Sequence, residues 1–129
     1  MANKLVFVDT NVLMELLFER SSHDLAKDTI LALATDDIVC TSILSISTLL
    51  YFVESERFDK TTAHNFMNSF KILDMNQEDY IWATANDQGD FEDALQTACA
   101  RRHTCSSLIT FDKKFDSMYG KFLVIHTIK

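Results

Sequence analysis

The stretch Lys4–Val8 reads KLVFV and is followed at once by the polar segment Asp9-Thr10-Asn11. An apolar run without alternating polar residues is typical of a strand that is buried on both faces of a parallel sheet. After the polar segment, apolar residues recur at helical spacing between Val12 and Leu17. The opening of the chain therefore predicts a buried strand, a polar turn and an amphipathic helix.

The same alternation of strand and helix continues to the end of the chain. Further strands are predicted over Asp37–Thr41, Lys71–Leu73, Ser107–Thr110 and Phe122–Ile125. Helices are predicted from Ser21 or Ser22 to Ala34, and over Ser45–Glu56, Thr61–Phe70, Gln77–Ala85 and Phe91–Arg102. This order predicts an α/β fold, a three-layer sandwich in which helices flank a central parallel sheet of about four to five strands. No repeat, linker or low-complexity tract is visible, so we expect a single domain over residues 1–129.

Composition narrows the classes of function. The chain has 129 residues, and its 12 basic and 19 acidic residues give a net charge of −7, which argues against a module that coats nucleic acid by bulk charge. Two glycines are too few for a P-loop or a GxGxxG dinucleotide motif. Three cysteines without CxxC spacing argue against a secreted disulfide scaffold. We expect a cytoplasmic protein without a membrane span, because no apolar stretch approaches 20 residues.

Acidic residues follow the predicted strands where ligands bind in parallel sheets. Asp9 follows the first strand, and Asp112 follows the Ser107–Thr110 strand by two residues. Asp90 and Asp93 open the helix that precedes this strand. Each acid alone can be a helix cap, but several carboxylates at one sheet edge repel one another unless a cation neutralises them. Oxygen ligands without histidine or cysteine favour Mg²⁺ or Mn²⁺.

Three segments resemble the signature segments of the PIN domain family. They are Val8–Leu13 (VDTNVL), Asp90–Ala94 (DFEDA) and Leu108–Lys113 (LITFDK). The family comprises metal-dependent ribonucleases, including VapC-type toxins of toxin–antitoxin pairs. The resemblance therefore implies an endoribonuclease that hydrolyses RNA phosphodiester bonds with Mg²⁺ or Mn²⁺, an antitoxin protein as a partner, and a homodimer.

The resemblance also assigns roles to particular residues. It makes Asp9, Asp93 and Asp112 the catalytic, metal-ligating acids. Side chains that orient these carboxylates or supply auxiliary acids are Asn11, Thr110, Asp90 and Asp116. The basic residues that flank Asp112 and are candidates for contact with the RNA backbone are Lys113 and Lys114.

One position departs from the family pattern. The family usually carries a glutamate on the helix after its second strand, where this chain has Thr48. The nearest acid is Glu54, and six residues along a helix correspond to about 9 Å, which is too far for a simple replacement. Thr48 therefore favours an alternative in which the fold is catalytically weak or inactive and serves as a protein- or RNA-binding module.

Two other chemistries remain as minor alternatives. Cys99, His103 and Cys105 have tolerable spacing for zinc but no obvious fourth ligand. A phosphoaspartate enzyme of the haloacid dehalogenase type needs a second aspartate two residues after the first, and Asn11 occupies that position.

Overall fold

A computed structural model describes residues 3–129, and within them the chain forms five strands and seven helices. The strands are β1 (Leu5–Val8), β2 (Ile38–Ser42), β3 (Lys71–Leu73), β4 (Ser107–Thr110) and β5 (Val124–Thr127). The helices are α1 (Thr10–Leu17), α2 (His23–Leu33), α3 (Ile43–Ser55), α4 (Lys60–Met67), α5 (Gln77–Asn86), α6 (Phe91–Arg102) and α7 (Phe115–Tyr119). No helix among these residues is long and apolar enough to cross a membrane.

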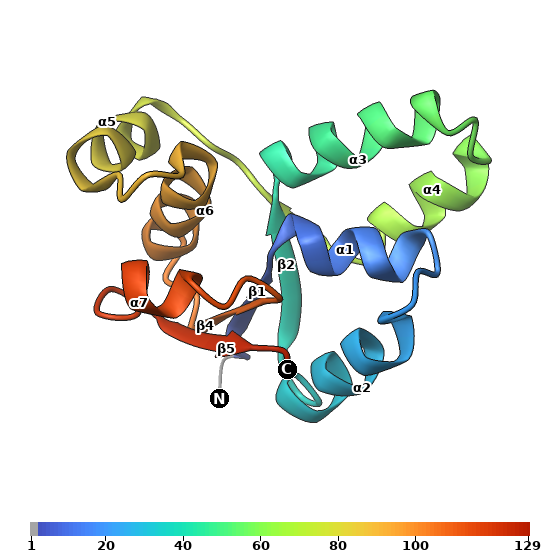
Figure 1. Ribbon diagram of the computed structural model, residues 1–129, viewed down its shortest axis with the longest axis horizontal. Coiled ribbons are helices and arrows are strands. Elements are labelled where there is room, and N and C mark those ends of the chain that lie inside the picture. The colour runs from blue at the N-terminus through green and yellow to red at the C-terminus, as the bar shows by residue number, and fades with distance from the viewer. Residues whose placement is uncertain (1–2) are drawn as a thin grey trace.

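The five strands form one sheet in the order β3-β2-β1-β4-β5, and every neighbouring pair is parallel. In Figure 1 helices α1 to α4 lie on one side of this sheet and α5 to α7 on the other. The predicted α/β sandwich with a central parallel sheet is confirmed. Its strand order reverses at β1, which pairs with β2 on one side and β4 on the other, and this is where ligands bind in such sheets.

Strand β1 shows why an unbroken apolar run is needed at the centre. Val6 and Val8 belong to a hydrophobic cluster that includes residues of α1, α3 and α4, whereas Phe7 belongs to a second cluster that includes residues of α6 and α7. Successive side chains of a strand point to opposite faces, so both faces of β1 must be apolar. All three side chains are at most 1% exposed.

Two predictions near the carboxyl end need correction. The last strand is Val124–Thr127 and not Phe122–Ile125, because Phe122 and Leu123 pack into the second cluster ahead of the strand. Helix α7, five residues between Asp112 and the last strand, was not among the predicted helices, although Asp112 was considered as a possible helix cap. The other elements begin and end within a few residues of their predicted bounds.

Candidate active site

Three of the predicted acids lie around the point where the strand order reverses. Asp9 is the N-cap of α1 directly after β1, and Asp112 follows the neighbouring strand β4. Asp93 lies in the first turn of α6, whose N-cap is Asp90. The negative charges of Asp9, Asp90 and Asp112 all raise the pKa of Asp93, which places the four carboxylates in one electrostatic neighbourhood.

Asp9 is held by hydrogen bonds to both of its carboxylate oxygens. Its Oδ1 accepts from the backbone N–H of Thr10 at 2.8 Å and from Nε2 of Gln96 at 3.4 Å. Its Oδ2 accepts from Oγ1 of Thr110 at 2.9 Å. Burial raises the pKa of Asp9 to about 6, although these three hydrogen bonds act in the opposite direction. The side chain is 5% exposed, so its orientation is fixed before any ligand arrives.

Asp93 is the most electrostatically strained of the acids. Burial, followed by the charges of Asp9, Asp90 and Asp112, raises its pKa to about 8. Among the described residues, its Oδ2 is the buried side-chain oxygen or nitrogen atom that has no hydrogen-bond partner. A buried acceptor without a donor costs about 1–3 kcal/mol, and more when it is charged. The site is thus suited to a cation or a proton at this oxygen.

Asn11 and Thr110 connect the turn after β1 to the turn after β4. Nδ2 of Asn11 donates to Oγ1 of Thr110 at 3.2 Å, and Oδ1 of Asn11 accepts from the backbone N–H of Phe111 at 3.2 Å. Oγ1 of Thr110 also accepts from the backbone N–H of Asp112 at 3.0 Å. These contacts link the turn that carries Asp9 to the backbone at Phe111 and Asp112.

A cavity of about 310 Å³ opens beside the acids. Its lining residues come from the loop before α6, from α6 and from the segment before and within α7: Gln88, Gly89, Asp90, Asp93, Asp112, Lys114 and Met118. Gly89 has a φ of 116°, a conformation that side chains rarely adopt, which explains glycine at this turn. The cavity therefore brings together four charged residues: the exposed Asp90, the half-buried Asp93, Asp112 and Lys114.

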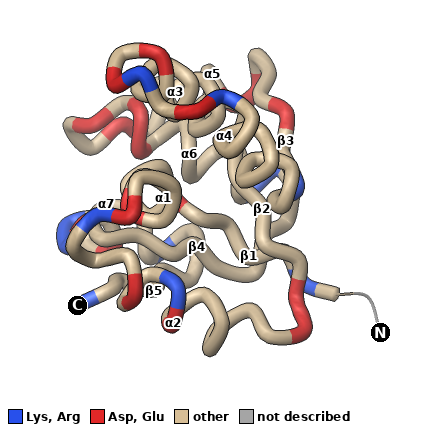
Figure 2. Tube along the Cα trace, turned by 90° about the vertical axis from the view of Figure 1, so that its right-hand side faces the viewer, with Lys and Arg blue, Asp and Glu red and all other residues tan. Residues whose placement is uncertain are grey.

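Lys113 and Asp116 face a different space. They line a second groove with Thr127 and Lys129, beside the end of β5. Basic and acidic segments of the tube lie next to one another near α7 in Figure 2. The structure thus separates the two adjacent lysines, with Lys114 at the acid-lined cavity and Lys113 at the neighbouring groove. It also places Asp116 outside the lining of the acid cavity.

Thr48 is half-buried on α3 and does not compensate for the missing glutamate. Its hydroxyl donates to the backbone carbonyl of Leu44 at 3.1 Å, within its own helix. The hydrogen bonds of residues 3–129 include none between Thr48 and any of the predicted acids. Ser45, one turn earlier on α3, is the residue of this helix that contacts the site, through Thr10 and Gln96.

Gln96 is a site residue that the sequence did not reveal. It lies on α6 one turn after Asp93, is 0% exposed, and contacts Asp9 as well as hydroxyl groups of Thr10, Ser42 and Ser45. A single glutamine on a helix carries no motif. The available signal was its position three residues after Asp93, on a helix whose neighbouring residues are mostly small and apolar.

The carboxylate chemistry of these acids suits a divalent cation, but the side chains are not spaced as the ligands of one ion. Within residues 3–129, no three His, Cys, Asp or Glu side chains already lie together at metal-ligating distances. The donors are carboxylate oxygens, which suit Mg²⁺ or Mn²⁺, and the unpaired Oδ2 of Asp93 lacks a positive partner. A bound ion would supply that partner and relieve the like-charge repulsion that raises the pKa of Asp93.

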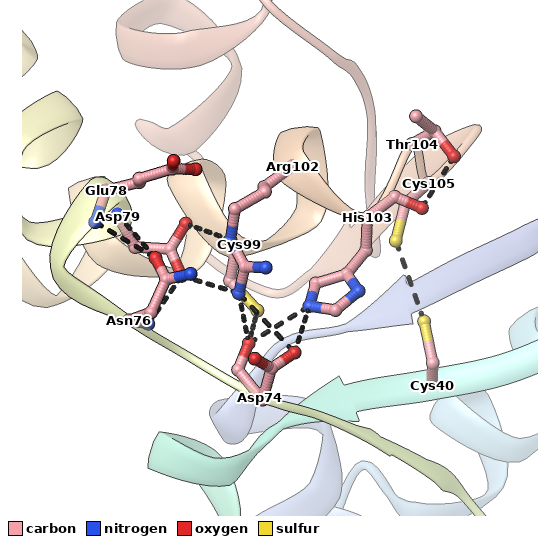
Figure 3. A network of polar contacts seen from close by, with 10 residues as sticks. All are labelled: Cys40, Asp74, Asn76, Glu78, Asp79, Cys99, Arg102, His103, Thr104 and Cys105. Atoms are coloured by element: carbon pink, nitrogen blue, oxygen red, sulfur yellow. Dashed lines mark hydrogen bonds and ion pairs between the residues drawn. The ribbon is translucent and has the colours of Figure 1, made fainter.

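The alternative zinc site does not form in the described part of the chain. His103 pairs with Asp74 at 2.9 Å, and Sγ of Cys99 donates to the backbone carbonyl of Asp74 (Figure 3). Sγ of Cys105 instead contacts Sγ of Cys40 at 3.7 Å. Cys99 and His103 both contact Asp74, whereas Cys105 contacts Cys40, and no three His, Cys, Asp or Glu side chains of the described residues lie where they could hold a metal ion together.

A family model for the PIN domain matches residues 6–121, and no curated protein sequence matches the chain. Among solved structures the chain is similar to a toxin–antitoxin complex from Klebsiella pneumoniae, at 20% identity and a TM-score of 0.76 over 96% of this chain and 98% of that chain. It is also similar to VapBC2 from Rickettsia felis bound to promoter DNA, at 16% identity and a TM-score of 0.74 over 97% of this chain and 99% of that chain. A third is VapC20 from Mycobacterium tuberculosis, described as a toxin that cleaves the sarcin–ricin loop, at 19% identity and a TM-score of 0.65 over 87% of this chain and 93% of that chain. These identities show a shared fold, and the family model shows more: the chain belongs to the PIN domain family.

Proposed function

We propose that the protein is a metal-dependent endoribonuclease in which Asp9, Asp93 and Asp112 hold Mg²⁺ or Mn²⁺. The observation that carries this proposal is Asp93, whose buried Oδ2 has no hydrogen-bond partner in the described part of the chain and whose pKa is raised to about 8 by burial and by the charges of Asp9, Asp90 and Asp112. An arrangement that costs stability in the metal-free protein is expected where a cation binds. Membership of the PIN domain family supports the same reaction class.

The side chains divide the work between holding the ion and orienting the substrate. When bound, the ion supplies a Lewis acid that activates water and stabilises the charge on the phosphate. Asp93 must give up its proton to become a ligand, and because its pKa is raised to about 8, the ion has to displace that proton near neutral pH. Thr110 and Asn11 hold Asp9 and Asp112 at a fixed separation across β1 and β4. Lys114, at the cavity wall, can contact a phosphate of the RNA backbone.

We further propose that an antitoxin protein binds this chain, and that the chain forms a homodimer. The support for the antitoxin is that similar structures from Klebsiella pneumoniae and Rickettsia felis are described as toxin–antitoxin or VapBC complexes. An antitoxin that covered the acidic cavity would block access of RNA to the proposed site. Mixing the chain with a candidate antitoxin and measuring complex mass by light scattering tests both assemblies.

The experiment that tests the nuclease proposal measures Mn²⁺ binding and RNA cleavage on the same preparation. Calorimetry should show Mn²⁺ binding to the wild type and strongly reduced binding to Asp9→Asn and Asp112→Asn. Cleavage of a mixed RNA pool should require the metal, stop with a chelator and fail in both variants. A wild type that binds no Mn²⁺ at millimolar concentration, or variants that cleave as well as the wild type, would refute the proposal.

The second candidate function is a binding module without turnover. Thr48 favours it, because its hydroxyl is directed to its own helix and supplies no anionic ligand. In that case Mn²⁺ would leave the melting temperature unchanged, while an antitoxin or RNA would still bind. Thermal unfolding with and without Mn²⁺ separates the two candidates before any substrate is known.

A further inference from the structure

Gln96 is a fully buried amide at the meeting point of α1, β2, α3 and α6. Its Nε2 lies 2.7 Å from Oγ of Ser45, 3.0 Å from Oγ1 of Thr10 and 3.4 Å from Oδ1 of Asp9. Its Oε1 accepts from the hydroxyl of Ser42. Burying an amide is costly unless its hydrogen bonds are made, so these contacts are what allows Gln96 to lie in the core.

The surrounding hydrogen bonds fix which way the amide points. Oγ of Ser42 accepts from the backbone N–H of Ser45 at 3.1 Å, at the beginning of α3, so its single hydrogen is directed elsewhere. Of its two acceptor neighbours, Oε1 of Gln96 is nearer than Oγ of Ser45. With Oε1 turned towards Ser42, the two N–H groups of Gln96 face Ser45, Thr10 and Asp9. A chain of hydrogen bonds therefore runs from the positive N-terminal end of α3 through Ser42 and Gln96 to the carboxylate of Asp9.

This orientation decides which oxygen of Asp9 remains available. Oδ1 accepts from both Thr10 and Gln96, which uses its two lone-pair directions. Oδ2 accepts only from Thr110 among the hydrogen bonds of the described residues, which leaves one direction open. A cation at the site would therefore meet Asp9 through Oδ2 alone.

We propose that Gln96 is a positioning residue that holds Oδ1 of Asp9 and presents Oδ2 to the divalent cation. The proposal rests on the proposed metal site, and it assigns to Gln96 an orienting contact to a ligand rather than contact with the substrate. It also gives a reason for Ser42 and Ser45, which keep the amide turned the right way. The contact to Asp9 is direct through Nε2, and indirect through Thr10, whose backbone N–H binds the same Oδ1.

The test compares two variants that each disturb a buried polar group. Gln96→Met keeps the length of the side chain and removes both N–H donors. Asp79→Asn is the matched control, because Asp79 is 2% exposed and paired with Arg102 at 3.0 Å, at the other end of α6 from Asp93. Figure 3 shows this pair among residues that include none of Asp9, Asp93 and Asp112. Ser42→Ala is a second test variant, which retains the amide and removes its orienting donor.

Three measurements are made on each protein. Thermal unfolding without metal reports stability, calorimetry at pH 8 reports Mn²⁺ affinity, and the ¹³Cγ resonance of Asp9 in the metal-free protein at pH 8 reports the surroundings of its carboxylate. Loss of a residue that orients a metal ligand typically weakens metal binding by about 10- to 100-fold. We expect a loss in this range and a displaced Asp9 resonance for Gln96→Met, and smaller changes in the same directions for Ser42→Ala.

Asp79→Asn should lower the melting temperature while leaving Mn²⁺ affinity and the Asp9 resonance as in the wild type. Equal Mn²⁺ affinity in Gln96→Met and the wild type would overturn the positioning role. So would an equal loss of affinity in Asp79→Asn, since Gln96 would then act through stability alone. If Gln96→Met does not fold, Ser42→Ala decides by the same criteria. If the wild type binds no Mn²⁺, the proposed function is refuted, and the Asp9 resonance alone decides whether Gln96 orients Asp9.

Discussion

Asp93 is a half-buried acid close to other acids, and no donor among the described residues forms a hydrogen bond with its Oδ2. Burial together with the charges of Asp9, Asp90 and Asp112 raises its pKa to about 8. Near neutral pH a large share of the metal-free protein therefore holds a proton on Asp93. A divalent ion must replace that proton, which links metal binding to pH through one side chain.

The substitution Asp93→Asn should raise metal-free stability or leave it unchanged, while it abolishes cleavage and weakens Mn²⁺ binding. An amide has the shape of the carboxyl group but removes the like-charge repulsion. We expect the melting temperature without metal to rise by about 0–5 °C. Glu92→Gln is the control, because Glu92 is exposed on the same turn and should change neither property much. An Asp93→Asn protein that unfolds would show that Asp93 has a structural role instead.

Stability without metal should fall as pH rises between about 4 and 8. Over this range the folded protein retains the proton on Asp93 that the unfolded chain releases at its ordinary pKa of 3.8, so raising the pH favours unfolding. Asp9, with a pKa of about 6, contributes in the same direction over the lower part of the range. After allowing for solvent screening, we expect the free energy of unfolding to fall by about 1–2 kcal/mol.

Chemical unfolding at several pH values measures this pH dependence of stability, and Asp93→Asn should give a flatter profile. With saturating Mn²⁺ the slope should weaken or reverse, because the ion binds the ionised form.

A strand could be predicted from the sequence where it is buried on both faces, because only apolar residues fit there. Val6, Phe7 and Val8 must be apolar because β1 is covered on both faces, and the apolar run shows it. Helix α7 was not predictable, since five residues give barely more than one turn of periodicity. The last strand was displaced because the apolar residues Phe122 and Leu123 serve packing ahead of β5.

Some residues of the candidate site could likewise be predicted from the sequence, and others could not. Asp9 and Asp112 could be placed from sequence because both follow apolar strands whose ends meet at one edge. Gln96 could not, because its importance comes from Ser42 and Thr10, which are 54 and 86 residues away in the chain. The division of Lys113 and Lys114 between two cavities was equally hidden, since it depends on how the turn before α7 runs.

The substitution Thr48→Glu tests whether α3 faces the metal. Thr48 is half-buried and lies one turn after Ser45, which contacts the site, so a longer acidic side chain from this turn has the reach to supply a ligand. We expect tighter Mn²⁺ binding and faster cleavage, because each added anionic oxygen favours a hard cation. Calorimetry should show affinity raised by about tenfold, equivalent to ~1.4 kcal/mol. Thr48→Gln is the control, with similar length and no charge. Equal affinities in wild type and Thr48→Glu would mean that position 48 does not face the metal.

The net charge of the protein opposes binding of RNA, so basic residues beside the proposed site matter for holding it. The net charge is −7, and Arg20 and Arg102 are engaged in ion pairs with acids of the chain. Lys113 and Lys114 lie directly beside Asp112, and each lines one of two neighbouring cavities. RNA bound at the proposed site would pass these two lysines, whose positive charges offset the repulsion from the acids.

Replacing both residues, Lys113→Ala with Lys114→Ala, should weaken RNA binding while Mn²⁺ affinity stays equal or rises slightly. Alanine keeps the backbone N–H of residue 114 that donates to Oδ1 of Asp112 at 2.9 Å, so the turn before α7 is retained. Removing two phosphate contacts should reduce the slope of log affinity against log salt by about 1.4 for single-stranded RNA. Fluorescence anisotropy at several salt concentrations, in the Asp93→Asn background to prevent cleavage, measures this slope. The control replaces Lys27 and Lys60, exposed lysines near the beginnings of α2 and α4, and should leave the slope unchanged. Equal slopes in both double variants would show that RNA reaches the acids by another path, because the only difference between them is where the two charges are lost.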